Sequence, residues 1–176
     1  MDTSTFQRRC RAAAFLMGAL VLAACGTFEP EKSPAFYENL GRAGAEVNAS
    51  AAASMISDYR RLNGLPAVEL DPTLLQIAQD QARSMAAVDK LTHDPGGRGF
   101  TQRLRAANYD AARAAENVGA GYRTLAEAFS GWRDSPSHKA NMLLPGATKM
   151  RIATAYAPGS KYKVFWAFVV AEPARR

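Results

Sequence analysis

The sequence predicts an α+β fold: an α-β-α sandwich in which helices cover both faces of a small antiparallel sheet. The main observation is the segment 162–170, where apolar side chains alternate onto both faces. A strand that is apolar on both faces is buried on both sides, so helices must cover each side. The segment 150–156 shows the alternation of a second, antiparallel strand. At 176 residues the chain is long enough for one such domain.

The first 24 residues predict an export signal. Three arginines within residues 1–11 precede an uncharged run, Ala12–Ala24. A helix of that length reaches about 20 Å, short of a hydrocarbon core of about 30 Å, so the pattern is typical of a signal peptide. The run ends in Leu22-Ala23-Ala24-Cys25-Gly26, which resembles the bacterial lipoprotein box and makes Cys25 the predicted lipidation site. The alternatives are an ordinary signal peptide cut nearby and an uncleaved anchor.

Residues 25–49 are expected to form a lipidated N-terminus and a flexible tether, because prolines and glycines recur there with mixed charges. Gly26, rather than an acid, follows the cysteine. By resemblance to Gram-negative sorting signals, this favours the outer membrane, with the protein facing the periplasm. The folded domain is expected over 50–172, and 173–176 form a short tail.

Three amphipathic stretches predict the covering helices. The first stops at Asn63-Gly64, and its apolar face consists of Met55, Ile56, Tyr59 and Leu62. The second opens at Asp71-Pro72, an N-cap followed by proline at the first helical position. The third starts at the capping box Thr124–Glu127 and turns Trp132 into the core.

Shorter elements complete the predicted chain. Residues 92–99 form a loop, because four of the eight are glycine or proline. Residues 101–107 are a short helix, and 116–121 are a short strand because their glycines disfavour a helix. Ser135-Pro136 caps and restarts a helix that carries His138 and Asn141.

Charge and motifs exclude several classes of function. The formal net charge is +6, but the positive residues are scattered, so no nucleic-acid partner is expected. The sequence lacks the nucleophile elbow of the α/β-hydrolases, the metalloprotease helix motif and a glycine-rich phosphate loop. Glu116 has no evident second carboxylate of the kind a glycosidase needs, since Asp94-Pro95 is more typical of a turn.

The candidate site rests on the only two histidines, His93 and His138, together with Glu116. His138 follows a helix start, where positive charge is disfavoured, so its imidazole is expected to be neutral and free to bind a ligand. Two imidazoles and one carboxylate suit zinc or a similar ion. The structural alternative is that Glu116 accepts loop amides or pairs with Arg98, while the histidines tie loops together.

Several segments together resemble the CAP superfamily of cysteine-rich secretory, antigen 5 and pathogenesis-related proteins, in its bacterial branch. The matching segments are Leu91-Thr92-His93, Gly97-Arg98, Ala115–Gly119 and Gly131–Leu143, followed by the final strand pair. The resemblance implies the same α-β-α sandwich and a cleft containing His93, Glu116 and His138, sometimes around a divalent metal. Arg98 and Asn141 would support this cleft. Ser135 occupies the position of a second family glutamate, so any zinc would be weakly held.

The functional expectation is a CAP domain that is lipid-anchored in the cell envelope and non-catalytic. Its partners would be the membrane, through the N-terminal lipid, and either an envelope polymer, lipid or protein or an apolar ligand bound in the cleft. The alternative is an envelope hydrolase, a peptidase or wall-active enzyme, that uses the same residues. A purely structural envelope protein is a third possibility.

Overall fold

The structure is a computed structural model that describes residues 34–175. The predicted signal peptide and Cys25 lie outside these residues, so the export and lipidation predictions rest on the sequence alone. The described residues hold a four-stranded sheet in the order β1-β3-β4-β2. The strands are β1 (Glu69–Leu70), β2 (Ala111–Ala120), β3 (Lys149–Ala157) and β4 (Lys163–Pro173).

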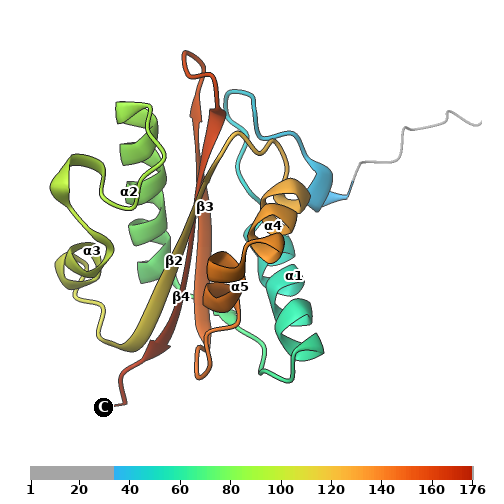
Figure 1. Ribbon diagram of the computed structural model, residues 1–176, viewed down its shortest axis with the longest axis vertical. Coiled ribbons are helices and arrows are strands. Elements are labelled where there is room, and N and C mark those ends of the chain that lie inside the picture. The colour runs from blue at the N-terminus through green and yellow to red at the C-terminus, as the bar shows by residue number, and fades with distance from the viewer. Residues whose placement is uncertain (1–33, 176) are drawn as a thin grey trace, which may run out of the picture. The chain divides into compact units, whose positions relative to one another are not determined.

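Helices cover both faces of this sheet, as predicted (Figure 1). One face carries α2 and α3, and the other carries α1, α4 and α5. Their bounds are α1 (Ala49–Leu62), α2 (Pro72–Val88), α3 (Phe100–Ala106), α4 (Leu125–Asp134) and α5 (Pro136–Met142), with 3₁₀ turns η1 (Ala35–Tyr37) and η2 (Pro95–Gly97). The α-β-α sandwich is therefore confirmed.

The two faces of β4 are packed differently. Trp166, Phe168 and Val170 belong to a large core shared with Trp132 of α4. The opposite side chains, among them Ala167, belong to a second core that α2 covers with small residues such as Ala78 and Ala82. Trp132 and Trp166 are almost completely buried, at 1% and 0% exposure. Burial on both sides of β4 was the basis of the fold prediction, and it is confirmed.

The sheet differs from the prediction in two respects. β1 pairs in parallel with β3, through Glu69 opposite Lys149, so the sheet is not wholly antiparallel. Two residues are too few for an alternating pattern to reveal such a strand. β2 begins at Ala111 rather than at Glu116, because its first half is a run of alanines and one arginine that pairs with β4 regardless of side-chain pattern.

Helix starts follow the predicted caps in two of three cases. The Asp71 carboxylate accepts hydrogen bonds from the backbone N–H groups of Thr73 and Leu74, at 2.8 and 2.9 Å. Thr124 Oγ1 accepts from the N–H of Glu127, whose carboxylate accepts from the N–H of Arg123. Ser135 makes no side-chain cap bond, so its predicted capping role is wrong; its hydroxyl instead lies 3.4 Å from that of Ser137.

The packed unit starts earlier than the predicted boundary at residue 50. Leu40, in the segment assigned to the tether, is 3% exposed and belongs to the large core. Its N–H donates to the carbonyl of Arg123, at 2.7 Å. The predicted inner face of α1 is also incomplete, because Leu62 is 85% exposed while Arg60 is fully buried. Helical periodicity cannot register a buried arginine as part of an apolar face.

Candidate functional site

The predicted site residues lie at the open edge of the sheet, along β2. β2 is the last strand in the order β1-β3-β4-β2, so only one side of it is paired. Successive side chains of a strand point to opposite faces. Glu116 lies opposite Val169, on the α2 side, whereas Asn117 lies opposite Phe168, on the α4 side. Groups from both helical layers can therefore meet beside this one strand.

Glu116 is the buried centre of the site, with its side chain only 2% exposed. Its Oε2 pairs with Nη2 of Arg103 at 2.5 Å, and its Oε1 lies 2.9 Å from Nδ1 of His93. A charge taken out of water requires such partners, since an unpaired buried carboxylate is strongly unfavourable. Both oxygens of Glu116 are thus already engaged within the protein.

Arg103 holds the loop before α3 as well as the carboxylate. Its Nη1 donates to the carbonyl of His93 at 3.1 Å and to the carbonyl of Arg98 at 2.7 Å. The guanidinium that pairs with Glu116 is therefore that of Arg103, and Arg98 contributes its backbone carbonyl. Sequence reasoning missed Arg103, because an arginine in a short charged helix is usually solvent-exposed.

His93 connects the buried carboxylate to solvent. Its side chain is 55% exposed although Nδ1 contacts Glu116. A carboxylate can only accept hydrogen bonds, so Nδ1 carries the proton and Nε2 of the neutral ring is an acceptor facing away from Glu116. This is the arrangement in which a carboxylate fixes both the tautomer and the orientation of an imidazole.

His138 lies on α5, on the other side of β2. Burial lowers the pKa of His138 below its usual value, and the charge of His93 lowers the pKa further. The neutral imidazole is thus favoured, as the sequence predicted, although burial rather than the helix start is the main cause. His93 and His138 are each linked to neighbouring residues of β2, His93 through Glu116 and the His138 carbonyl through Asn117.

Two asparagines fasten α5 to β2. Asn117 is fully buried, and its Nδ2 donates to the carbonyl of His138 at 3.0 Å. Asn141 Nδ2 donates to the carbonyl of Glu116 at 3.1 Å and to Oδ1 of Asn117 at 2.9 Å. Asn141 is therefore a hydrogen-bonding residue rather than plain helix surface. The burial of Asn117 is visible only in the structure, so the sequence did not locate this contact.

The donor set does not fit a zinc ion held by His93, His138 and Glu116. Within residues 34–175, no group of three or more His, Cys, Asp or Glu side chains is arranged to hold a metal. Glu116 Oε2 already pairs with a guanidinium, whose positive charge opposes a cation at the same oxygen. Two imidazoles remain, which is fewer than the three protein ligands usual in zinc enzymes.

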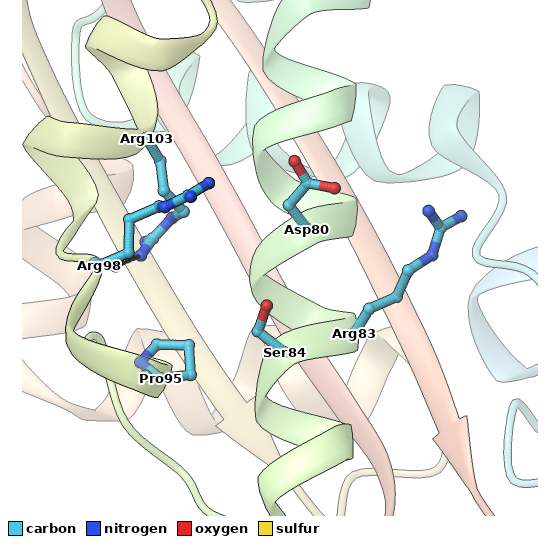
Figure 2. A pocket seen from close by; sticks show the side chains of 7 residues that line it. Asp80, Arg83, Ser84, Pro95, Arg98 and Arg103 are labelled. Atoms are coloured by element: carbon cyan, nitrogen blue, oxygen red, sulfur yellow. Dashed lines mark hydrogen bonds between the residues drawn. The ribbon is translucent and has the colours of Figure 1, made fainter.

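A cavity of about 480 Å³ lies on the α2 side of Arg103. It is lined by Asp80, Arg83 and Ser84 of α2, by Pro95, Gly96 and Arg98 of the loop, and by Arg103. Figure 2 shows the loop residues and Arg103 on one side and α2 on the other. His93, Glu116 and His138 do not line this cavity, so it is separate from the predicted cleft and shares only Arg103 with the cluster.

Within the described part of the chain, no helix has both the length and the apolar character needed to cross a bilayer. In the same residues, the histidine side chains form no hydrogen bond to a serine, threonine or cysteine side chain. The arrangement can orient a neutral imidazole and accept hydrogen bonds from a ligand.

Comparisons with known proteins agree with this fold. The family model described as CAP, cysteine-rich secretory protein family, matches residues 53–171. No curated protein matches the chain. An outer surface protein of Borrelia burgdorferi has a similar structure, with a TM-score of 0.64 and 20% identity, over 71% of this chain and 92% of that one.

Two further solved structures have the same fold. An extracellular protein of Bacillus anthracis that contains an SCP domain gives a TM-score of 0.61 and 20% identity, over 70% of this chain and 39% of that one. A cysteine-rich secretory protein of Staphylococcus aureus gives a TM-score of 0.58 and 16% identity, over 70% of this chain and 37% of that one. The chain thus spans about two fifths of these two longer proteins.

Proposed function

We propose that this chain, which belongs to the CAP family of cysteine-rich secretory proteins, is a lipid-anchored cell-envelope protein that binds an envelope component without catalysing a reaction. The binding site is the surface around His93 and His138 at the edge of β2. The ligand is a polymer, lipid or protein that presents hydrogen-bond donors to the imidazole nitrogens. No step of this function uses a metal ion.

The observation that carries the proposal is the engagement of Glu116. Its two oxygens are taken up by Arg103 and by His93. A general base or a metal ligand must have a free lone pair within reach of the substrate. A carboxylate that is 2% exposed and doubly paired instead orients His93 for binding. This supports a binding site over a hydrolytic one.

Export and anchoring are supported by the N-terminal sequence pattern and by the location of structurally similar proteins. Cys25 directly follows the apolar run and would be the only cysteine left after cleavage before it. The similar proteins from Bacillus anthracis and Borrelia burgdorferi are described as extracellular and outer-surface proteins. We infer the same side of the membrane for this chain, and the outer membrane from Gly26.

A hydrolase is the second candidate, because His93 is held as a catalytic histidine would be. Its Nδ1 contacts a buried carboxylate and its ring is half exposed. An imidazole in that setting could activate a water or a substrate hydroxyl. The Arg103 charge on the same carboxylate weakens this comparison, since it offsets the stabilisation that Glu116 would give to a protonated His93.

The two candidates are separated by one experiment with the purified full chain. It is incubated with isolated peptidoglycan, outer-membrane vesicles and a peptide mixture, and both retention and product release are measured. We expect retention on an envelope fraction without products, lost in the His93→Ala/His138→Ala variant and kept in Lys139→Ala, the exposed neighbour. Product release that depends on the histidines would overturn the binding proposal in favour of the hydrolase.

Anchoring has its own test. Mass spectrometry of the N-terminal peptide from native membranes should detect a diacylglyceryl modification on Cys25, and Cys25→Ser should leave the membrane fraction. An N-terminus elsewhere, or an unmodified Cys25, would contradict the lipoprotein proposal without bearing on the site.

A further inference from the structure

The segment that carries His93 is held by side chains rather than by backbone pairing. Leu91, Thr92 and His93 form no backbone–backbone hydrogen bond among residues 34–175. Two buried side chains hold the segment instead. Nε2 of Gln81, on α2, donates to the carbonyl of Thr92 at 2.7 Å, and Nη1 of Arg103, on α3, donates to the carbonyl of His93 at 3.1 Å.

These two carbonyls belong to the peptide units on either side of the Cα of His93. Each peptide unit is planar, so holding both carbonyls fixes the direction in which the His93 side chain leaves the backbone. The imidazole then reaches Oε1 of Glu116, with Nδ1 at 2.9 Å. The orientation of His93 therefore depends on the carbonyl of Thr92 as well as on the carboxylate of Glu116.

Gln81 differs in character from the rest of the buried face of α2. Its side chain is 0% exposed, and the other buried residues of this helix are the apolar Leu74, Ile77, Ala78, Ala82 and Met85. A buried amide is unfavourable unless its polar atoms are hydrogen-bonded, and Oε1 of Gln81 accepts no hydrogen bond from the part of the chain that the structure describes. A methionine of similar length would pack here without an unpaired oxygen. What glutamine adds at this position is the bond to Thr92.

We propose that Gln81 is a positioning residue of the binding site, which holds the carbonyl of Thr92 so that His93 keeps Nδ1 on Glu116 and presents Nε2 to the ligand. Because Gln81 is fully buried, it acts through His93 and does not touch the ligand itself. The effect of Gln81 on ligand binding rests on the proposed function, whereas its effect on the imidazole is a property of the protein without ligand.

The first measurement is the tautomer of His93 in the purified full chain, from the ¹⁵N chemical shifts of its ring at about pH 8.5, where imidazole is ordinarily neutral. We expect the form with the proton on Nδ1 in the wild type, because Glu116 can only accept a hydrogen bond. Gln81→Met should give a mixture with the form protonated on Nε2, since the ring is no longer fixed on Glu116. His138→Gln identifies which signals belong to His93.

The second measurement compares binding with stability. Gln81→Met should weaken retention on the envelope fraction that holds the wild type by about tenfold, the value of one hydrogen bond at the upper end of its usual range. Its melting temperature should equal or exceed that of the wild type, because methionine leaves no buried amide oxygen without a partner. A residue with a structural role alone would lose stability and binding together. Gln81→Leu, a second apolar variant, should behave in the same way.

Two variants serve as matched controls. Gln76→Met makes the same chemical change at an exposed position of α2 and should leave the tautomer, retention and melting temperature unchanged. Ser57→Ala removes a buried hydroxyl that bonds to the backbone of Val68, on α1 in the opposite helical layer. It should lower the melting temperature and leave the His93 tautomer unchanged.

Three results would overturn the proposal: a wild-type tautomer in Gln81→Met, an equal change of tautomer in Ser57→Ala, or a larger loss of melting temperature in Gln81→Met than in Ser57→Ala. Failure of the proposed function looks different. If no envelope fraction retains the wild type but Gln81→Met still changes the tautomer of His93, the positioning role stands and the binding proposal falls.

Discussion

Arg60 and Arg103 are both buried arginines, but they lie in regions with different tasks. Arg60 is 0% exposed and Arg103 is 6% exposed. Arg60 has only backbone carbonyls as partners, whereas Arg103 also pairs with a carboxylate and lines a cavity. The comparison teaches that burial of a charge does not by itself mark a functional site. A buried charge is a better indication of a functional site when its partners are titratable side chains than when they are backbone groups.

Arg60 is a structural clamp between distant parts of one helical layer. Its guanidinium donates to the carbonyls of Pro66, Met142, Leu144 and Ala147, at 2.9 to 3.0 Å. These acceptors lie in the turn after α1, at the last residue of α5 and in the segment between α5 and β3. Burial lowers the pKa of Arg60, since no carboxylate compensates for the lost water. Five donors in a rigid fork suit this task, and a lysine could not replace them.

Arg103 belongs to a chain of contacts that reaches solvent. It holds Glu116, which holds His93, and the imidazole is half exposed. Its other side lines the cavity beside α2. The same residue type therefore tightens the fold in one region and, in the other, lies between the candidate site and the cavity beside α2.

The largest expected effect is that of Arg60→Met. It removes one charge but leaves four carbonyls without their donor, so we expect a loss of about 5 kcal/mol in the free energy of unfolding. Denaturant unfolding measures this loss. Arg61→Met, at the adjacent exposed position, should stay within about 0.5 kcal/mol of wild type. Equal effects of the two variants would show that Arg60 is not a clamp.

Arg103→Met should cost less, about 3 kcal/mol, and the loss should be partly recoverable. The variant leaves Glu116 as an uncompensated buried charge, which Glu116→Gln removes. The double variant should therefore be more stable than Arg103→Met alone by about 1–2 kcal/mol. No second substitution should rescue Arg60→Met in this way. Additive losses in the double-mutant cycle would mean that the Arg103–Glu116 pair is not coupled.

A smaller effect is expected from pH. The folded-state pKa of His138 is lowered by burial and by His93, so the unfolded chain binds the proton more tightly. The contribution to stability is complete above the unfolded pKa of about 6.5 and is lost as pH falls through the lower folded pKa. The midpoint temperature of thermal unfolding should vary less with pH in His138→Gln than in the wild type, between about pH 7.5 and 5. Lys139→Gln, at the neighbouring exposed position, should keep the wild-type slope.

The smallest effect concerns zinc. Because Arg103 occupies the carboxylate that would complete a metal site, zinc should bind the wild type only weakly through the two imidazoles. Calorimetry should detect no tight site at about pH 7.5, and any weak heat should fall as the pH is lowered, because a protonated imidazole cannot bind a metal. Tight zinc binding that disappears in His93→Ala/His138→Ala would show that Glu116 exchanges Arg103 for a metal.

Local signals in the sequence identified much of the fold. The double-sided apolar pattern of 162–170 correctly placed β4 at the centre of a covered sheet, and Asp71-Pro72 marked the start of α2. The sequence did not reveal the short strand β1, because two residues are too few to show an alternating pattern. It did not reveal the packing of Leu40 either, because a single leucine in a proline-rich segment does not define an apolar helix face. The absence of a Ser135 cap bond could not be foreseen, since it depends on where the hydroxyl turns.

The sequence by itself determined the sandwich architecture, the family resemblance and the three residues of the candidate site, because periodicity, caps and motif order are local along the chain. Only the tertiary structure decided which charged side chains are buried and what they meet. Arg60 reaches carbonyls 82 to 87 residues away, and Glu116 takes Arg103 rather than Arg98 as its partner. A side chain's partner in space depends on how the layers pack, and that information is not local to any segment.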